Sequence, residues 1–391
     1  MISVDELLKE ARQLLPNMTK TRREIHQHPE LSFQEFSTSA LIMERLEGLG
    51  IEHHSIAGTG VYAIVRCGKP NAEVIALRAD MDALPVTEAT GLPFASTVAG
   101  VMHACGHDLH TSCLLGAAEL LIGHKKQLNY DVLLLFQPGE EMIPGGAKKI
   151  IEEGLFDKFK PKAMFALHVD PDLPVGKFGF RPSWYMASGD EIYLKVTGRG
   201  GHAALPHTVT DTVLATAEII VSLQQVVSRR APAGIPTVLS FGKVVANGAT
   251  NVIPDEVLVE GTFRTFDETW RTNAHQVITD VAVNIAKAHG AQCKVEVKHG
   301  YPALYNNPEL TQYSIDMLAR LWRSENINAL DIRMTTEDFA RYSHLFPSVF
   351  FRLGVAGQKS VGRLHAGNFS PDEEALFYGS ASLIWLVLSL E

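Results

Sequence analysis

Three apolar segments of this sequence each end in side chains that can bind a metal ion or transfer a proton. They are residues 74–80, ending in Asp80, residues 132–141, ending in Glu140 and Glu141, and residues 164–168, ending in His168. In parallel strands the carboxyl ends meet at one edge of the sheet, where open α/β proteins place their chemistry. The three segments therefore predict a parallel sheet with a metal-dependent active site at that edge.

Charge and composition exclude several kinds of partner. The chain has 391 residues, 46% of them hydrophobic and 20% charged, as in ordinary soluble globular proteins. Its net charge is -9 and it has no dense run of Lys or Arg, so we expect no nucleic-acid partner. The first ten residues include early acids and no unbroken apolar stretch. They predict an amphipathic helix and not a signal peptide, and hence a cytoplasmic protein.

The longest apolar run and the cysteines give two further expectations. Residues 375–390 are apolar but are interrupted by Gly and Ser, and they fall short of the roughly 18 to 20 residues that a bilayer requires. We therefore expect a buried C-terminal helix and no membrane partner. Four scattered cysteines are too few for a disulfide framework in a chain of this size, so reduced thiols are expected and Cys105 is free to act as a ligand.

Two domains are predicted from the order of strand-like and helix-like patterns. The first half alternates strand and helix over residues 74–80, 109–128, 130–136, 145–159 and 163–169. This order indicates an α/β catalytic domain with a mostly parallel sheet. Residues 191–298 follow the order β-α-β-β-α-β of a ferredoxin-like sandwich. We expect a discontinuous metal-binding domain over residues 1–185 and 301–391, with an α+β domain inserted over residues 186–300.

The sequence offers a mixed set of sulfur, nitrogen and oxygen donors. The set consists of Cys105, His107, Glu141, His168 and His365. Such donors suit Zn(II), Mn(II), Co(II) or Ni(II) better than Ca(II) or Mg(II), which prefer oxygen alone. Taken singly, a histidine at a strand end, a Cys between Ala and Gly, and a pair of Glu residues are more often structural than functional. Their convergence favours a metal site, because such groups are costly near a buried sheet edge unless they are paired or metal-bound.

The adjacent carboxylates Glu140 and Glu141 indicate a reaction. One carboxylate can hold a metal ion while its neighbour acts as general base, because a bound cation lowers the pKa of water to about 7. This combination is typical of metal-assisted hydrolysis of an amide or ester.

Ordered motifs along nearly the full length resemble one family. They are residues 22–31 (RREIHQHPEL), 77–85 (LRADMDALP), 105–108 (CGHD), 136–141 (FQPGEE), 200–204 (GGHAA), 251–254 (NVIP) and 364–365 (LH). The chain resembles the aminoacylase and carboxypeptidase family of co-catalytic metallopeptidases. It is most similar to the amidohydrolase branch, which contains hippurate hydrolases, N-acyl-amino-acid amidohydrolases and plant auxin-conjugate hydrolases.

The resemblance implies two divalent metal ions per subunit, Zn(II) or Mn(II), with Co(II) or Ni(II) as alternatives. Cys105 would bridge the two ions, Glu141 and His365 would bind one of them, and His107 and His168 would bind the other. Glu140 would be the general base.

Two positions depart from the wider family. Arg78 stands where that family has a ligand His, and Cys105 stands where it has a bridging Asp. The resemblance therefore implies that Asp80 supports the site from behind the ligands instead of binding metal.

For the inserted domain, the resemblance implies a lid and dimerisation module. A histidine matching His202 reaches the active site of the partner subunit and polarises the scissile carbonyl, so a homodimer is expected. Asn251 matches a substrate-contacting position, and Arg264 is a candidate for binding a substrate carboxylate. On the residues alone, His202 and Asn251 are more simply read as turn residues.

The implied activity is hydrolysis of an N-acyl amino acid, a small-molecule substrate, to a carboxylic acid and a free amino acid. Deacetylation of N-acetyl-diaminopimelate and carboxypeptidase action on small peptides are alternatives at the same site. A thiol hydrolase with Cys105 as nucleophile and His103 or His107 as its base is a more distant one, and it leaves Glu141, His168 and His365 unexplained. A non-catalytic binding protein would have no evident need for Glu140.

Overall fold

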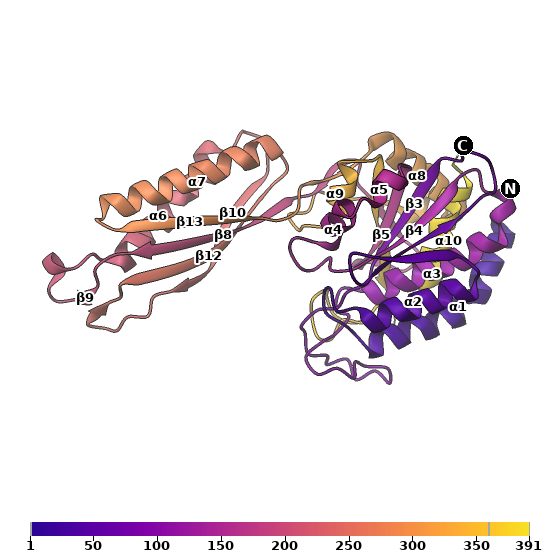
Figure 1. The fold of residues 1–391 in the computed structure, drawn as a ribbon, viewed down its shortest axis with the longest axis horizontal. Coiled ribbons are helices and arrows are strands. Elements are labelled where there is room, and N and C mark those ends of the chain that lie inside the picture. Colours follow the sequence, from indigo (N-terminus) through magenta and orange to yellow (C-terminus); the bar gives the residue numbers. More distant parts are fainter. Residues whose placement is uncertain (1, 359, 391) are drawn as a thin grey trace. The chain divides into compact units, whose positions relative to one another are not determined.

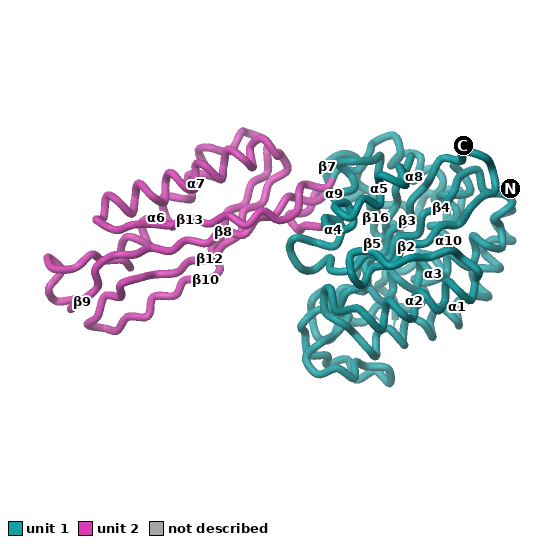
Figure 2. Tube along the Cα trace, in the orientation of Figure 1, with its two compact units in different colours: residues 1–185, 305–331, 338–391 teal, residues 186–304, 332–337 magenta. Residues whose placement is uncertain are grey.

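The structure is a computed structural model that describes residues 2–358 and 360–390. The chain forms two compact units (Figure 2). Unit 1 comprises Met1–Tyr185, Tyr305–Asp331 and Asp338–Glu391, and unit 2 comprises Met186–Leu304 and Ile332–Glu337. Unit 2 therefore includes a short segment, residues 332–337, that the sequence patterns did not assign to the inserted domain. This segment belongs there because the backbone N–H of Ala187 donates to the carbonyl oxygens of Arg333 and Thr335, at 3.0 and 3.1 Å.

Unit 1 is built on an eight-stranded mixed sheet (Figure 1). In spatial order its strands are β1 (Glu52–Ile56), β2 (Gly60–Val65), β4 (Asp131–Gln137), β3 (Val74–Asp80), β5 (Pro161–Pro174), β16 (Ser348–Ala356), β6 (Phe178–Phe180) and β15 (Ile327–Ala329). The four central strands run parallel, while β1 and β2 add an antiparallel edge. In the parallel register Asp80 lies opposite Gln137, and this pairing aligns the ends of β3 and β4. The expected α/β class with a mostly parallel central sheet is confirmed.

Helices surround this sheet. They are α1 (Val4–Gln27), α2 (Phe36–Gly48), α3 (His107–Gly123), α4 (Gly146–Glu152), α5 (Leu155–Lys158), α8 (Pro308–Trp322), α9 (Ala340–Ser343) and α10 (Ala375–Leu388). Helices α1, α3 and α10 pack against one another. All residues of β4 are buried, and α10 is almost wholly buried, so the apolar C-terminal run forms an internal helix as expected. Among the described residues, no helix combines the length and the hydrophobicity needed to cross a membrane.

Helix α3 begins earlier than its sequence pattern suggests. The pattern starts at residue 109 with Asp108 as the expected N-cap, but the helix starts at His107. Gly106 precedes it in the left-handed conformation with a φ of 82°, and a Cβ there would lie 2.7 Å from Val169. Glycine is required at this turn, and it places His107 in the first helical turn next to the sheet edge.

The expected helix over residues 145–159 is two short helices. Gly154 separates α4 from α5 and adopts the left-handed conformation with a φ of 77°. A glycine in this conformation ends a helix. The apolar pattern of the sequence continues past Gly154 although the helical hydrogen bonding does not, and for this reason the pattern predicted a single helix.

Unit 2 has its own sheet and core. Its strands β8 (Ser188–Thr197), β10 (Thr237–Val245), β12 (Glu256–Thr265) and β13 (Gln292–His299) pair antiparallel in the order β10-β12-β8-β13. Helices α6 (Thr212–Gln225) and α7 (Glu268–Ala288) pack together and complete the expected β-α-β-β-α-β order. The short strands β9 (Gly201–His202) and β11 (Val252–Ile253) form a separate ribbon.

A buried carboxylate ties the elements of unit 2 together. Asp190 on β8 accepts hydrogen bonds from Nε and Nη2 of Arg271, at 2.8 and 2.5 Å, and lies 2.7 Å from Nε2 of His275. It also accepts from the backbone N–H of Gly300 at 3.0 Å. Burial alone would raise the pKa of Asp190, but the hydrogen bonds from Arg271 and His275 hold it well below the usual range.

Candidate metal centre

The candidate ligands of unit 1 come from different elements of the sheet, helices and loops. His107 is the first residue of α3, His168 lies within β5, and Glu141 follows the end of β4. His365 lies in the loop before α10 and adopts a positive φ of 64°. Its backbone N–H donates to the carbonyl oxygen of Ala104 at 2.8 Å, which holds this loop against the segment that carries Cys105.

Among the described residues, five groups of three side chains could each hold a metal ion, and two of these groups share Cys105. The first group is Cys105, His107 and His168, and the second is Cys105, Glu141 and His365. In each group the donor atoms lie within 4.8 Å of one another. Sγ of Cys105 is 3.4 Å from Nε2 of His168, and Nε2 of His365 is 3.2 Å from Oε1 of Glu141. The structure thus brings together all five ligands expected from the sequence, around one thiol.

The donor atoms fit a bound cation. Nε2 of His107 and Oε1 of Glu141 are buried and have no hydrogen-bond partner among the described residues. Although Oε1 of Glu141 is close to His365, the angles do not make a hydrogen bond, so the two side chains face a common space instead of each other. Leaving a buried polar atom unpaired costs about 1–3 kcal/mol. A divalent ion bonded to these atoms removes that cost.

The electrostatics of the site also favour positive charge. The proximity of Cys105 and Glu141 raises the pKa of His365 to about 10, against a smaller opposing effect of burial. Burial raises the pKa of the Cys105 thiol above its ordinary value, so the protein alone does not stabilise a thiolate there. A cation does stabilise a thiolate, which agrees better with a ligand role for Cys105 than with that of a free nucleophile.

Asp82, which the sequence reasoning did not single out, supports both groups of ligands. Its Oδ1 lies 3.2 Å from Nδ1 of His107, and its Oδ2 accepts from the backbone N–H of Glu141 at 3.0 Å and from the hydroxyl of Ser32 at 2.7 Å. A carboxylate on Nδ1 fixes the ring so that Nε2 is free to face a metal. The signal that could have found Asp82 is its place two residues after Asp80, just beyond the strand.

Asp80 contacts Arg78 and two histidines behind the candidate ligands. Its Oδ1 lies 2.5 Å from Nδ1 of His110, and its Oδ2 accepts from Arg78 at 2.7 Å and is 3.7 Å from Nε2 of His107. Nε2 of His110 accepts from the backbone N–H of Val169 at 2.9 Å, next to His168 on β5. Asp80 is therefore fully buried behind the ligands, while the contact with Nδ1 of His107 belongs to Asp82.

Glu140 is buried next to these donors. It forms a further group with His107 and Glu141 in which donor atoms lie within 4.8 Å. The backbone N–H of Asp338 donates to Oε1 of Glu140 at 3.4 Å. The tight turn after β4 is closed by Gly146, whose N–H donates to the carbonyl oxygen of Gly139 at 3.0 Å. The turn directs the two adjacent carboxylates of residues 140 and 141 into the same site.

Three expected residues belong to unit 2. His202 is exposed on β9, opposite Val252, and the N–H of Ala203 donates to the carbonyl oxygen of Asn251 at 3.0 Å. His202 and Asn251 therefore lie side by side. Arg264 lies on β12 opposite Gly189, and its Nε donates to the hydroxyl of Thr262 at 3.0 Å.

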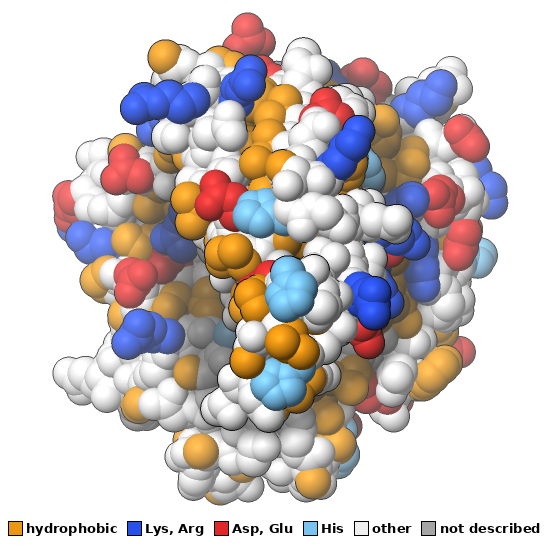
Figure 3. Space-filling view, turned by 90° about the vertical axis from the view of Figure 1, so that its left-hand side faces the viewer, with side chains coloured by type: hydrophobic (Ala, Val, Ile, Leu, Met, Phe, Trp, Pro, Cys, Tyr) orange, Lys and Arg blue, Asp and Glu red, His pale blue; other side chains and the backbone are white. Residues whose placement is uncertain are grey.

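Exposed hydrophobic side chains occur in the same region of unit 2. They are Leu205, Val213, Leu214 and Val252, each between 42% and 55% exposed. On the face drawn in Figure 3, histidine side chains lie at the surface among hydrophobic ones.

The N-terminal motif performs structural tasks. Nε of Arg22 donates to Oδ2 of Asp108 at 2.7 Å, and His26 lies 2.8 Å from the same oxygen, so the first helix is tied to the start of α3. Glu30 accepts from the backbone N–H groups of Ser37 and Thr38, both at 2.9 Å, at the first turn of α2.

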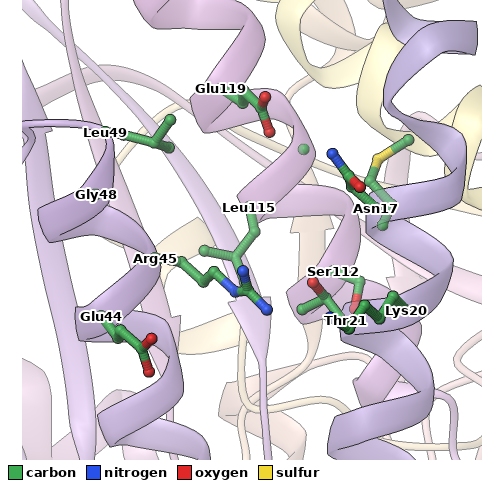
Figure 4. Close-up of a pocket in the computed structure, with 12 residues that line it drawn as sticks. Asn17, Lys20, Thr21, Glu44, Arg45, Gly48, Leu49, Ser112, Leu115 and Glu119 are labelled. Carbon is green, nitrogen blue, oxygen red and sulfur yellow. The ribbon is translucent and has the colours of Figure 1, made fainter.

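A separate pocket of unit 1 lies between α1, α2 and α3 and has a volume of about 440 Å³ (Figure 4). Arg45 extends into it from α2, and Ser112 and Leu115 line it from α3. None of the five candidate ligands lines this pocket, so it is distinct from the metal centre.

The fold and the donor set define the chain as a metal-dependent hydrolase of amide bonds. Residues 76–388 match the model of peptidase family M20/M25/M40, and the chain belongs to this family. It is 40% identical over 362 residues to an N-acetyl-L-cysteine deacetylase of Bacillus subtilis, covering 92% of this chain and 84% of the relative. It is 35% identical over 383 residues to thermostable carboxypeptidase 1 of Saccharolobus solfataricus, covering 96% of each.

Solved structures agree with this assignment. A dinuclear metal-binding peptidase of family M20 from Bacillus subtilis superposes with a TM-score of 0.82 at 35% identity, covering 96% of this chain and 98% of that one. One longer relative, a putative glutamate–cysteine ligase of Rhodococcus jostii, is 38% identical over 372 residues. The chain spans only 46% of that relative's length.

Proposed function

We propose that this protein hydrolyses the amide bond of N-acyl amino acids, with two divalent ions bound by two groups of ligands that share Cys105. The observation that carries the proposal is the pair of donor groups around one thiol, with the buried Glu140 beside them. The products are a carboxylic acid and a free amino acid. The deacetylase and the carboxypeptidase among the relatives both cleave bonds of this class, as their names state.

Glu140 moves the proton in this reaction. The bound ions supply a lowered water pKa, near 7, and polarisation of the substrate carbonyl. Glu140 takes the proton of the attacking water and delivers it to the nitrogen of the leaving amine. The N–H of Asp338 holds Oε1 of Glu140, and Asp82 holds the ring of His107, so the two side chains keep their positions while the proton moves.

The proposal includes finer assignments. The ions are Zn(II) or Mn(II), with Co(II) or Ni(II) as alternatives, and the protein is a cytoplasmic homodimer that associates through unit 2. His202 polarises the carbonyl in the partner's site, Asn251 contacts the substrate, and Arg264 binds its carboxylate. The proposed association through unit 2 is supported by the exposure of His202 and by the exposed hydrophobic side chains of that unit.

The test is a reconstitution screen. Metal-depleted protein is loaded with Zn(II), Mn(II), Co(II) or Ni(II), and release of free amino acid is measured from N-acetyl, N-benzoyl and indole-acyl amino acids, N-acetyl-diaminopimelate and small peptides. Glu140→Gln is expected to keep both ions and to lose 10²–10⁴-fold in kcat. Glu152→Gln, on the exposed face of α4, is the matched control and should match the wild type. A Glu140→Gln enzyme near the wild-type rate would show that the base is another residue.

The thiol hydrolase makes the opposite prediction in the same assay. Activity that survives EDTA and is abolished by iodoacetamide would favour Cys105 as nucleophile. Loss of activity with EDTA and its return on adding Zn(II) or Mn(II) would exclude that mechanism. Oligomeric state is tested separately by light scattering after size exclusion, where an active monomer would exclude the role of His202 across subunits.

A further inference from the structure

Behind the metal centre, one fully buried arginine binds three different elements of unit 1. Nη1 of Arg78 donates to Oδ2 of Asp80 at 2.7 Å, Nη2 donates to Oδ1 of Asp338 at 2.8 Å, and Nε donates to Oε1 of Gln137 at 3.1 Å. These partners lie at the end of β3, just before α9, and at the end of β4. The side chains of Arg78, Asp80 and Asp338 are all 0% exposed.

One arm of this network reaches the general base. Asp338 accepts from Nε2 of Gln137 at 2.8 Å and from the backbone N–H of Ala147 at 2.9 Å, in addition to Arg78. With its side chain fixed in this way, Asp338 donates its own N–H to Oε1 of Glu140 at 3.4 Å. The backbone that holds the base is thus anchored by Arg78.

The other arm reaches the back of the ligands. One carboxylate oxygen of Asp80 accepts a hydrogen bond from Arg78, and the other lies next to Nδ1 of His110. Nε2 of His110 in turn accepts a hydrogen bond from the N–H of Val169, the residue after the candidate ligand His168. Arg78 also supplies positive charge between two buried carboxylates, Asp80 and Asp338. Removing one partner of a buried ion pair leaves the remaining charge uncompensated, which is strongly destabilising.

We propose that Arg78 is a positioning residue for the reaction, which acts through Asp338 on Glu140 and does not touch the metal ions or the substrate. This inference rests on the proposed function, because it assigns Glu140 the proton transfer. The three nitrogens of one planar guanidinium serve three partners, and the ammonium of a lysine has no such fork. Arg78→Lys therefore keeps the positive charge but loses the fixed geometry of the three hydrogen bonds.

The experiment compares Arg78→Lys with wild-type enzyme in four measurements: metal ions per subunit, the absorption spectrum of the Co(II)-loaded protein, kcat and KM. We expect two ions and an unchanged Co(II) spectrum, with kcat lowered 10–100-fold and KM near that of the wild type. A structural role alone would lower metal content and stability together and leave the kcat of the loaded fraction intact. Arg66→Lys is the control and should leave all four unchanged, because the partly exposed Arg66 pairs with Asp131 at the far end of β4.

Asp338→Asn is the second variant, because it keeps the N–H to Glu140 but loses the charge that Arg78 holds. It should reproduce the loss of kcat, and combining Arg78→Lys with Glu140→Gln should lower the rate no further than Glu140→Gln alone. The positioning role is overturned if Arg78→Lys has the wild-type kcat, or if its loss of activity is proportional to its loss of bound metal. Wild-type protein without metal-dependent hydrolysis would instead refute the proposed function, and the inference with it.

Discussion

Asp82 gives the sharpest quantitative test of the metal centre. Asp82→Asn replaces the carboxylate that lies 3.2 Å from Nδ1 of His107 and accepts the N–H of Glu141 on its other oxygen. The amide can accept only through its single oxygen, so one of these two contacts is lost. If the amide group faces His107, its N–H donates to Nδ1 and the ring proton moves to Nε2, the atom that faces the metal.

The size of the effect follows from burial. Asp82 is 1% exposed, so water cannot replace the lost contact. Replacing such a supporting carboxylate typically costs 10–100-fold in metal affinity, which corresponds to about 1.4–2.7 kcal/mol. We expect the weaker binding mainly at the ion held by His107, because Glu141 is contacted through its backbone and not through its carboxylate.

The assay is competition with a chromophoric chelator that reports the affinity of each ion separately. Asp131→Asn is the matched control, because Asp131 accepts from Arg66 and from the N–H of Cys67 at the opposite end of β4. Its metal affinities should equal those of the wild type. Equal affinities in Asp82→Asn would refute the argument that this carboxylate orients His107.

Three other outcomes follow from the structure. Asp190→Asn should lower the free energy of unfolding by about 3–5 kcal/mol in urea titrations, whereas Glu256→Gln, in an exposed ion pair, should change it by less than about 1 kcal/mol. The pKa of Asp190 is lower in the folded than in the unfolded protein, so its stabilisation is fully present above its unfolded pKa of about 4 and is lost as the pH falls through its folded pKa. The difference in unfolding free energy between wild type and Asp190→Asn should therefore shrink in acid. A difference that stays constant with pH would contradict this origin. Gly146→Ala would place a Cβ 1.7 Å from the carbonyl oxygen of Pro138, so it should destabilise by about 1–3 kcal/mol and lower kcat; Gly123→Ala, with open space around it, should do neither in melting and rate measurements.

The sequence predicted elements whose local signals are strong. The apolar run of residues 74–80 coincides with β3, and the strand expected over residues 130–136 matches β4 to within one residue at each end. These segments combine β-branched or apolar residues with clear flanking breaks, so local pattern and tertiary packing agree. The start of α3 was not predicted correctly because it is determined by the left-handed backbone conformation of Gly106. A hydrophobic pattern carries no information about such a conformation.

Part of the site could also be anticipated. Cys105, Glu141 and His365 were named from donor chemistry and from the resemblance, and the structure brings them together. The supporting residues Asp82 and His110 were not named, since a buried carboxylate or imidazole carries no pattern of its own until its partners are known. The motif residue Arg78 was noted only as a departure, and its three-way hydrogen bonding depends on residues up to 260 positions away.

The two candidate donor groups that share Cys105 become complete at different points in the synthesis of the chain. Cys105, His107 and His168 are all present once the first 168 residues have left the ribosome, whereas the second group is incomplete until His365 emerges. Strand β16, which pairs with β5 along the segment that bears His168, is also made late, at residues 348–356. The donor residues of the first group are therefore all synthesised well before the second group is complete.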